Sequence, residues 1–271
     1  MHTPTDLSVI PRDIHFRTES ASANWLGGDP VATAVFNALS LTFPEGERLF
    51  IDAVRKFRGA AQGKLAEDVR AFIKQEAIHS REHAALNGTL DRDHYPVDWI
   101  DASVRKRLAF IRRLGPMRML GVTISLEHFT AMLADMFDTY PELWTGTSEE
   151  LVRLWRWHAM EETEHKAVAF DVFNEVTKDW TPGRRYRFRA RVMALVSMHF
   201  TVNITRYAAA LLEADGMGRW SARWRVLRFL FGTPGLFRRL GPRYREWFRP
   251  SFHPWDHDNR AKLEQWRQQF G

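Results

Sequence analysis

The 271-residue chain contains no cysteine. This absence excludes disulfides, thiolate nucleophiles, iron–sulfur clusters and zinc sites built on cysteine, so any metal ion must be held by histidine and carboxylate groups. The longest apolar run without a charge covers the 14 residues between Arg191 and Arg206, which is too short for a membrane-spanning helix. The first residues lack the basic-then-apolar pattern of a secretory signal, and we therefore expect a cytoplasmic protein.

Several sequence patterns of common enzyme classes are also missing. No segment alternates apolar and polar residues over a sustained length, which argues against a β-sheet protein. No glycine-rich phosphate loop and no Ser-His-Asp arrangement is present, which argues against nucleotide-dependent enzymes and serine hydrolases.

Charge is unevenly distributed along the chain. Residues 184–249 carry 15 arginines and three acidic residues, a net charge of +12, whereas residues 1–183 carry 21 basic and 27 acidic residues, a net charge of −6. The segment Thr181-Pro182-Gly183 marks the change. We therefore predict an N-terminal segment (residues 1–28), a bundle core (29–183) and a basic, aromatic, helical C-terminal part packed on it (184–271).

Helical signals cover most of the sequence. Asp29-Pro30 predicts the start of a helix, and Pro44 predicts a kink within it. The predicted helices span residues 30–58, 64–87, 99–113, 116–140, 149–178, 184–212, 220–231, 234–248 and 259–269. The fold class is therefore all-α, with helices long enough to form a four-helix bundle.

Two Glu-x-x-His pairs carry the chemical signal, Glu76–His79 and Glu162–His165. Residues three apart project from the same face of a helix, so each pair could hold one metal ion. Glu47 and Glu127 lie 29 and 35 residues earlier, each on the preceding predicted helix. A bundle with one glutamate on each of two helices and one Glu-x-x-His pair on each of the others forms a di-iron or di-manganese carboxylate site.

This arrangement resembles that of ferritin-like di-metal carboxylate proteins. More narrowly, the segments PEGERLFIDAVRKF, QEAIHSREH and WHAMEETEHKAVAFDVF resemble the bacterial family of predicted metal-dependent hydrolases, over roughly residues 20–215. The resemblance implies a ferritin-like four-helix bundle, and the charge pattern adds a basic helical extension at the C-terminus.

His158 extends the second pair, because it precedes Glu162 by four residues and so lies on the same helical stripe. This His-x-x-x-Glu-x-x-His pattern resembles arylamine N-oxygenases of the ferritin-like group, in which an extra histidine joins the second iron. The resemblance implies seven metal ligands: Glu47, Glu76, His79, Glu127, His158, Glu162 and His165. We expect the first three to hold one metal ion and the other four to hold the second.

The donor set leaves three functions open. We expect two iron ions, because imidazole and carboxylate donors suit Fe(II), with manganese or zinc as the alternative. The main hypothesis is a di-iron enzyme that activates dioxygen, with an electron donor, to oxidise a small apolar, amphiphilic or lipid-like substrate. The alternative is a di-metal-dependent hydrolase that uses a metal-bridging hydroxide. Iron storage without turnover is the third hypothesis.

For residues close to the motifs, we expect surface, packing or supporting roles and not metal binding. We expect Glu161 and Glu164 to face solvent or to form surface ion pairs. His83 is expected to be exposed or to lie behind the ligands, and His128 to pack. Asp135 and Asp171 could orient ligand histidines or serve at the surface. Five phenylalanines could line a substrate cavity or belong to the core: Phe43, Phe50, Phe72, Phe129 and Phe170.

The basic C-terminal part has three interpretations. In residues 184–249 aromatic residues alternate with arginines, as they do in interfacial helices. This part could therefore bind an anionic membrane surface at the inner face of the membrane. The aromatic residues concerned are Trp220, Trp224, Phe229, Phe231, Phe237 and Trp247. The same surface could instead pack on the bundle or on a second copy in a homodimer. Nucleic-acid binding is the least favoured interpretation, because no recognised motif is present.

Overall fold

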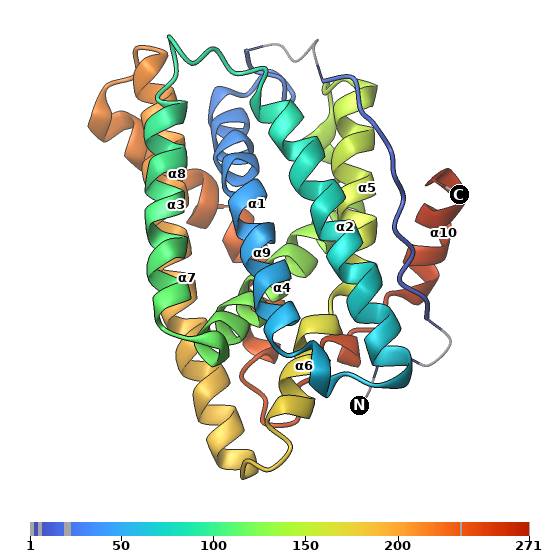
Figure 1. The fold of residues 1–271 in the computed structure, drawn as a ribbon. Coiled ribbons are helices and arrows are strands. Elements are labelled where there is room, and N and C mark those ends of the chain that lie inside the picture. The colour runs from blue at the N-terminus through green and yellow to red at the C-terminus, as the bar shows by residue number, and fades with distance from the viewer. Residues whose placement is uncertain (1–2, 5–6, 19–22, 234, 271) are drawn as a thin grey trace.

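The computed structural model describes residues 3–4, 7–18, 23–233 and 235–270 (Figure 1). Throughout these ranges the regular structure is helical and no strand occurs, so the all-α prediction is confirmed. The predicted N-terminal segment falls partly outside the described residues, as does Pro234 at the predicted start of a later helix. The division of the chain at residue 183 stays a prediction.

Ten α-helices follow one another along the described chain. They are α1 (Pro30–Lys56), α2 (Gly63–Asn87), α3 (Val97–Arg113), α4 (Pro116–Thr139), α5 (Glu149–His165), α6 (Val168–Val176), α7 (Pro182–Ala214), α8 (Arg219–Phe231), α9 (Leu236–Glu246) and α10 (Arg260–Phe270). Short 3₁₀ turns cover Arg58–Ala60, Pro141–Trp144 and Pro254–Asp256.

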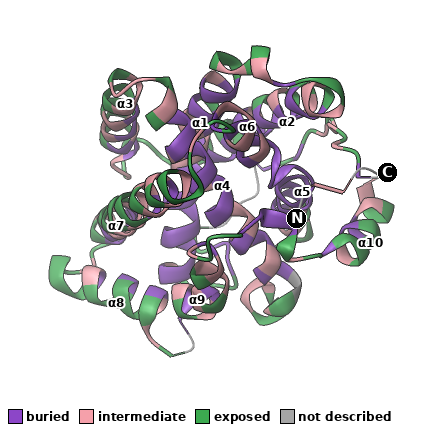
Figure 2. Cartoon of the chain, turned by 90° about the horizontal axis from the view of Figure 1, so that it is seen from below, coloured by how far each residue is buried: buried purple, intermediate pink, exposed green. Residues whose placement is uncertain are grey.

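Helices α1, α2, α4 and α5 form the centre of the bundle. Helix α1 packs against α2 and α4, and α5 packs against the same two helices. Figure 2 shows α4 in the middle of the molecule, with the other long helices around it. Helix α3 packs on α1, α7 covers α1 and α4, and α10 lies against α5.

Local sequence explains how α1 begins and how it passes Pro44. The Asp29 side chain caps the first turn, where its Oδ1 accepts the backbone N–H groups of Val31 at 2.7 Å and Ala32 at 3.0 Å. Pro44 has no N–H to donate to the carbonyl of Ser40, four residues earlier. The Asn87 amide on α2 donates to that carbonyl at 3.0 Å instead, and α1 continues without a break.

The single helix predicted over residues 149–178 is wrong, because α5 ends at His165 and α6 starts at Val168. No proline or glycine lies at this break, which is why the sequence does not reveal it. The buried Lys166 ammonium donates to the carbonyl of His257 at 2.8 Å and to Asn259 Oδ1 at 2.7 Å. It also lies 3.7 Å from the centre of the Trp255 ring. Contacts with the C-terminal segment therefore accompany the break directly after His165.

The C-terminal part packs on the bundle through a buried arginine. Arg189 on α7 donates to the backbone carbonyls of Trp247 and Arg249, and its guanidinium lies over the Trp247 ring. Trp247 is fully buried, and Phe229 and Phe237 are half-buried, so these three do not belong to an exposed aromatic face. No helix in the described part of the chain is both long and apolar enough to cross a membrane.

Candidate metal centre

The four central helices bring all seven predicted ligand residues into one buried cluster. Glu47 comes from α1, the Glu76–His79 pair from α2, and Glu127 from α4. His158 and the Glu162–His165 pair come from successive turns of α5. Every one of these side chains is buried, none with more than 4% of its surface exposed.

Short distances join the donor atoms across the bundle. His165 Nε2 lies 3.2 Å from Glu76 Oε1, 3.5 Å from Glu127 Oε2 and 3.4 Å from Glu162 Oε2. Glu162 Oε1 lies 2.9 Å from His158 Nε2 and 3.6 Å from His79 Nδ1. Glu162 therefore contacts both His79 of the other pair and His165 of its own pair.

Three groups of these residues have the geometry to hold a metal ion, because their donor atoms all lie within 4.8 Å of one another. The groups are Glu47 with His79 and His158, Glu76 with Glu127 and His165, and Glu76 with His79 and Glu162. The structure thus groups His158 with Glu47 and His79, whereas the sequence-based division put it with Glu127 and His165. The His158 ring stacks on the His79 ring, with a centroid distance of 4.4 Å, which explains this placement.

Nine donor atoms in this cluster are buried and have no hydrogen-bond partner in the part of the chain that the structure describes. They are both carboxylate oxygens of Glu47, Glu76 and Glu127, Glu162 Oε2, His79 Nδ1 and His165 Nε2. Burial of unpartnered carboxylates is costly, and ionised ones even more so. Two divalent cations would supply the missing partners and would balance the four carboxylate charges. The residues therefore fit a two-metal centre, in agreement with the metal-binding chemistry predicted from the sequence.

Each of the three histidines uses its other ring nitrogen to bond a side chain outside the cluster. His79 Nε2 lies 3.1 Å from Glu161 Oε2, and His165 Nδ1 lies 2.9 Å from Gln75 Oε1. His158 Nδ1 lies 2.7 Å from His83 Nε2. Such partners fix the ring orientation of metal-binding histidines, so each imidazole directs one nitrogen into the cluster.

The prediction that Glu161 and Glu164 face solvent is wrong, because both are buried. Glu161 Oε1 accepts the backbone N–H of Arg12 at 3.0 Å, and Glu164 Oε1 pairs with the Arg12 guanidinium at 2.9 Å. Arg267 on α10 bonds the same Glu164 oxygen at 2.8 Å. The N-terminal segment and α10 both cover this side of α5 (Figure 1), which is the physical reason for the burial.

His83 was predicted either to be exposed or to lie behind the ligand residues, and the structure shows the second arrangement. It is fully buried and joins His158 to Ser40, whose hydroxyl lies 2.9 Å from His83 Nδ1. The Ser40 hydroxyl in turn donates to Asn87 Oδ1 at 2.7 Å. The predicted packing role of His128 is confirmed, because its ring packs against Trp247.

Asp135 and Asp171 do not orient any ligand histidine. Asp171 Oδ1 lies 2.9 Å from His253 Nε2, and Asp135 Oδ2 pairs with Arg243 at 2.7 Å. Both partners belong to the C-terminal part, so these carboxylates attach that part to the bundle. Their alternative role as positioning groups for the ligands is thereby excluded in this structure.

The carboxyl groups of the cluster have strongly shifted pKa values. Burial raises the pKa of Glu47 and that of Glu127 well above the ordinary value, and the neighbouring Glu76 adds to both shifts. Burial acts in the same direction on Glu162, but interactions with His165 and other histidines outweigh it and hold its pKa well below the ordinary value. The raised pKa values favour the protonated forms of Glu47 and Glu127, and metal binding would displace those protons.

The histidines divide in the same way. Burial is the largest single influence on His79 and opposes its charged form, but the interactions with Glu161, Glu162 and Glu76 together outweigh burial and raise the pKa to about 10. Burial lowers the pKa of His158 to about 4 and that of His83 well below its ordinary value. His158 is therefore neutral near pH 7, which is the form that metal coordination requires.

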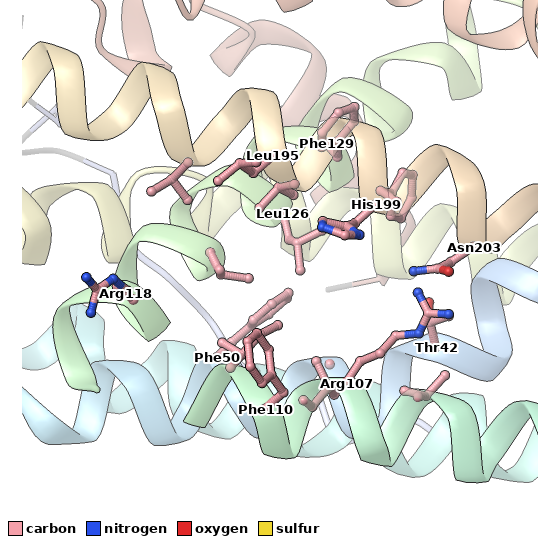
Figure 3. Close-up of a pocket in the computed structure, with 18 of the residues that line it drawn as sticks. Thr42, Phe50, Arg107, Phe110, Arg118, Leu126, Phe129, Leu195, His199 and Asn203 are labelled. Atoms are coloured by element: carbon pink, nitrogen blue, oxygen red, sulfur yellow. The ribbon is translucent and has the colours of Figure 1, made fainter. Parts of the chain in front are cut away.

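A cavity of about 1930 Å³ opens beside the cluster, with Glu47 and Glu162 in its wall. Helices α1, α3, α4 and α7 enclose it, and Figure 3 shows the apolar side chains that face it. Phe43, Phe50 and Phe129 line the cavity, as one of their predicted roles required. Phe72 instead packs against His165, with ring centroids 4.9 Å apart, and Phe170 packs against Trp247.

Comparison with known families agrees with the metal-binding character of this cluster. Residues 10–258, most of the chain, match the model of a family described as predicted metal-dependent hydrolase. Searches of curated proteins and of solved structures found no match. The resemblances to ferritin-like proteins and arylamine N-oxygenases stay predictions. The chain belongs to the family of predicted metal-dependent hydrolases.

Proposed function

We propose that this protein is a hydrolase whose buried Glu/His cluster holds two metal ions. The observation that carries this proposal is the set of nine buried donor atoms that have no hydrogen-bond partner among the described residues. Membership of a family of predicted metal-dependent hydrolases supports hydrolysis as the reaction.

We assign the ligands from the distances within the cluster. Glu47, His79 and His158 would hold one ion, and Glu76, Glu127 and His165 the other. Glu162, whose Oε1 lies near His158 and His79 and whose Oε2 lies near His165, would supply carboxylate oxygens to both groups. Two divalent ions held by these residues would supply Lewis acidity to the bond to be cleaved and would lower the pKa of a water bound to them.

The protein itself supplies orientation and a dry surrounding. Glu161, Gln75 and His83 each hold one ligand imidazole from behind. Phe43 packs against the His158 ring at 5.0 Å, and Phe72 packs against His165. Water therefore reaches the cluster from the cavity side, where Glu47 and Glu162 contribute to the wall. The substrate bond would enter from the same side.

Oxidation of an apolar substrate with dioxygen is the second candidate. Its support is the donor set of four carboxylates and three imidazoles, which suits Fe(II) and Mn(II) better than most metals. This reaction would require two iron ions and an external electron donor. Hydrolysis with zinc or manganese requires neither a redox change nor a donor.

Anaerobic assays with different metals separate these candidates. Metal-free protein would be loaded with Zn²⁺, Mn²⁺ or Fe²⁺ and tested for cleavage of nitrophenyl esters with acyl chains of increasing length. We expect cleavage without oxygen, and its loss in Glu162→Ala. Glu45→Gln is the control, because Glu45 lies on α1 close to Glu47 but pairs with Arg48 at the surface.

Three results would redirect the proposal. Oxygen consumption by the Fe²⁺ form with an electron donor, together with no cleavage by the Zn²⁺ or Mn²⁺ form, would favour oxidation. Iron uptake without turnover of any substrate would favour storage. Cleavage that persists in Glu162→Ala would show that the cluster is not the reacting centre.

A further inference from the structure

The cavity beside the metal centre is unusually rich in positive charge. Among the described residues that line it, the only acidic ones are Glu47 and Glu162, which belong to the metal cluster. Seven basic side chains also line it: Lys106, Arg107, Arg118, Arg184, Arg187, Arg191 and Arg206. A concave surface lined by one sign of charge concentrates ligands of the opposite charge. This cavity therefore favours an anion.

One end of the cavity gathers polar groups that suit an anionic head group. Figure 3 shows the Arg107 guanidinium, the His199 imidazole and the Asn203 amide together at that end, close to Thr42. Arg107 forms no ion pair with a carboxylate in the part of the chain that the structure describes, and its nearest aromatic contact is Tyr207. Arginine is suited to carboxylate and phosphate because its planar N–H groups bond two oxygens at once.

The wall of the cavity beyond this polar end is apolar. Phe50, Leu126, Phe129 and Leu195 face the space in Figure 3, and Leu195 has 57% of its surface exposed to it or to solvent. Thr42 precedes Glu47 by five residues on α1, so the polar end lies about 7.5 Å along the helix from the cluster. A ligand with a charged head at the polar end would thus place its chain along the apolar wall and past the cluster.

We propose that the cavity binds a long-chain anionic amphiphile, with its carboxylate or phosphate head between Arg107, His199 and Asn203. The chain lies along the apolar wall, so the bond that reacts lies near Glu47 and Glu162, several bonds from the head. This proposal rests on the proposed function, because it takes the metal cluster to be the reacting centre. The binding itself requires no reaction and can be measured alone.

Calorimetric titration of metal-free and metal-loaded protein with dodecanoate and dodecyl phosphate tests the proposal. Dodecanol tests the contribution of the head group, and inorganic phosphate tests the contribution of the chain. Arg107→Gln should weaken dodecanoate binding about tenfold or more, the loss typical of one charge-assisted hydrogen bond. Arg105→Gln, an exposed arginine on the same helix that does not line the cavity, is the control.

Saturable binding of one or both anionic amphiphiles, weakened in Arg107→Gln and unchanged in Arg105→Gln, is the expected result. Equal affinity for dodecanol, or equal loss in both variants, would overturn the assignment of the head-group site. If inorganic phosphate bound as tightly as dodecyl phosphate, the alkyl chain of the ligand would contribute nothing to binding, which would contradict the proposed apolar site. Binding without ester cleavage would refute the proposed function and leave this inference standing. Cleavage of nitrophenyl esters without binding of dodecanoate or dodecyl phosphate would refute this inference and leave the proposed function standing.

A separate surface feature carries a second inference. Helix α8 presents four apolar side chains at helical spacing, Trp220, Trp224, Leu227 and Phe231, with exposed fractions of 77%, 66%, 39% and 48%. The opposite face of α8 is buried through Ala222, Val226 and Leu230. Helix α8 lies at the edge of the molecule, on the side that also holds α3 and α7 (Figure 2). We refer to the four exposed side chains as the α8 stripe.

Charge indicates what covers the α8 stripe. Helix α8 also carries four arginines and no acidic residue: Arg219, Arg223, Arg225 and Arg228. A symmetric dimer through α8 would bring these like charges together. Tryptophan and arginine on one helix are typical of binding to the surface of an anionic bilayer. We infer that the α8 stripe docks on a membrane rich in anionic lipid.

Vesicle sedimentation tests this docking surface. The wild-type protein should sediment with vesicles that contain 30% phosphatidylglycerol and not with pure phosphatidylcholine, and Trp220→Ser/Trp224→Ser should lose this binding. Ile10→Ser is the control, because Ile10 is an exposed apolar residue outside α8. Absence of binding to anionic vesicles, or equal binding by both variants, would overturn the inference. So would a wild-type dimer that becomes monomeric in the double tryptophan variant, because a second copy would then cover the stripe.

Discussion

Substitution of Glu161 by glutamine tests whether the groups behind the ligands control metal binding. Glu161 uses both carboxylate oxygens: Oε2 lies 3.1 Å from His79 Nε2, and Oε1 accepts the backbone N–H of Arg12 at 3.0 Å. Glutamine has nearly the same shape but only one acceptor oxygen. In Glu161→Gln, the amide N–H₂ must therefore face the N–H of either His79 or Arg12. Neither choice preserves both hydrogen bonds.

The size of the effect follows from the role of such partners. Loss of a side chain that orients a metal-binding histidine typically weakens metal affinity 10- to 100-fold. This range corresponds to about 1.4–2.8 kcal/mol of binding free energy. The assay is competition for Zn²⁺ and Mn²⁺ between the protein and a chromophoric chelator.

Glu150→Gln provides the comparison, because Glu150 lies on the same helix and accepts the Arg17 N–H at the surface. Its metal affinity should equal that of the wild type. If Glu161→Gln also bound metal within twofold of the wild type, the claim that Glu161 positions His79 would be refuted.

Three further predictions follow from the same structure. Glu162→Ala should lower the metal content below two ions per chain, because Glu162 contacts both His79 and His165. Elemental analysis would show this loss, and two retained ions would contradict the role of Glu162 in both groups. In metal-free protein the folded state holds protons on Glu47, Glu127 and His79 that the unfolded state releases, because their pKa values are raised, that of His79 to about 10. Between pH 7 and 9 the unfolding free energy of metal-free protein should therefore fall relative to that of metal-loaded protein, in which the lowered pKa of Lys166 acts equally. The two histidines with lowered pKa values are neutral in both states in this range, and metal-loaded protein should lack the fall in thermal unfolding scans. Arg189→Met should lower the unfolding free energy by about 2–4 kcal/mol in urea titrations, because this substitution leaves the carbonyl of the buried Trp247 without its donor. An unchanged urea midpoint would contradict a stabilising role of Arg189.

The Glu/His cluster could be predicted from sequence because it depends on helical periodicity. Three-residue spacing places the Glu76–His79 and Glu162–His165 pairs each on one face of a helix. Glu47 lies on the helix before the first pair, and Glu127 lies on a helix before the second pair. In each case the intervening chain turns back and returns to the same level of the bundle. All of these side chains meet in the structure, although the grouping of His158 depends on packing against His79 across the bundle.

Features that depend on distant segments could not be predicted in this way. The burial of Glu161 and Glu164 depends on Arg12 and Arg267, which lie more than 100 residues away in the sequence. The break after His165 has no proline or glycine to mark it and accompanies contacts with the C-terminal segment. These elements cover α5 only after the whole chain has folded.

The aromatic residues of the C-terminal part show the same limit. Their spacing alone did not separate Trp220 and Trp224, which are exposed, from Trp247, which is fully buried. Burial of Trp247 follows from its contacts with Arg189 on α7, 58 residues earlier. Composition predicted an arginine-rich aromatic surface, but only the packing of α8 limits that surface to one stripe.

Metal stoichiometry tests the central claim most directly. Protein stripped by chelator and reloaded with Zn²⁺, Mn²⁺ or anaerobic Fe²⁺ would be desalted and measured by inductively coupled plasma mass spectrometry, beside Glu162→Ala and Glu45→Gln. The account predicts two ions per chain in the wild type and in Glu45→Gln, and fewer in Glu162→Ala. Less than one tightly bound ion per chain with every metal, or equal loading of all three proteins, would contradict the two-metal centre.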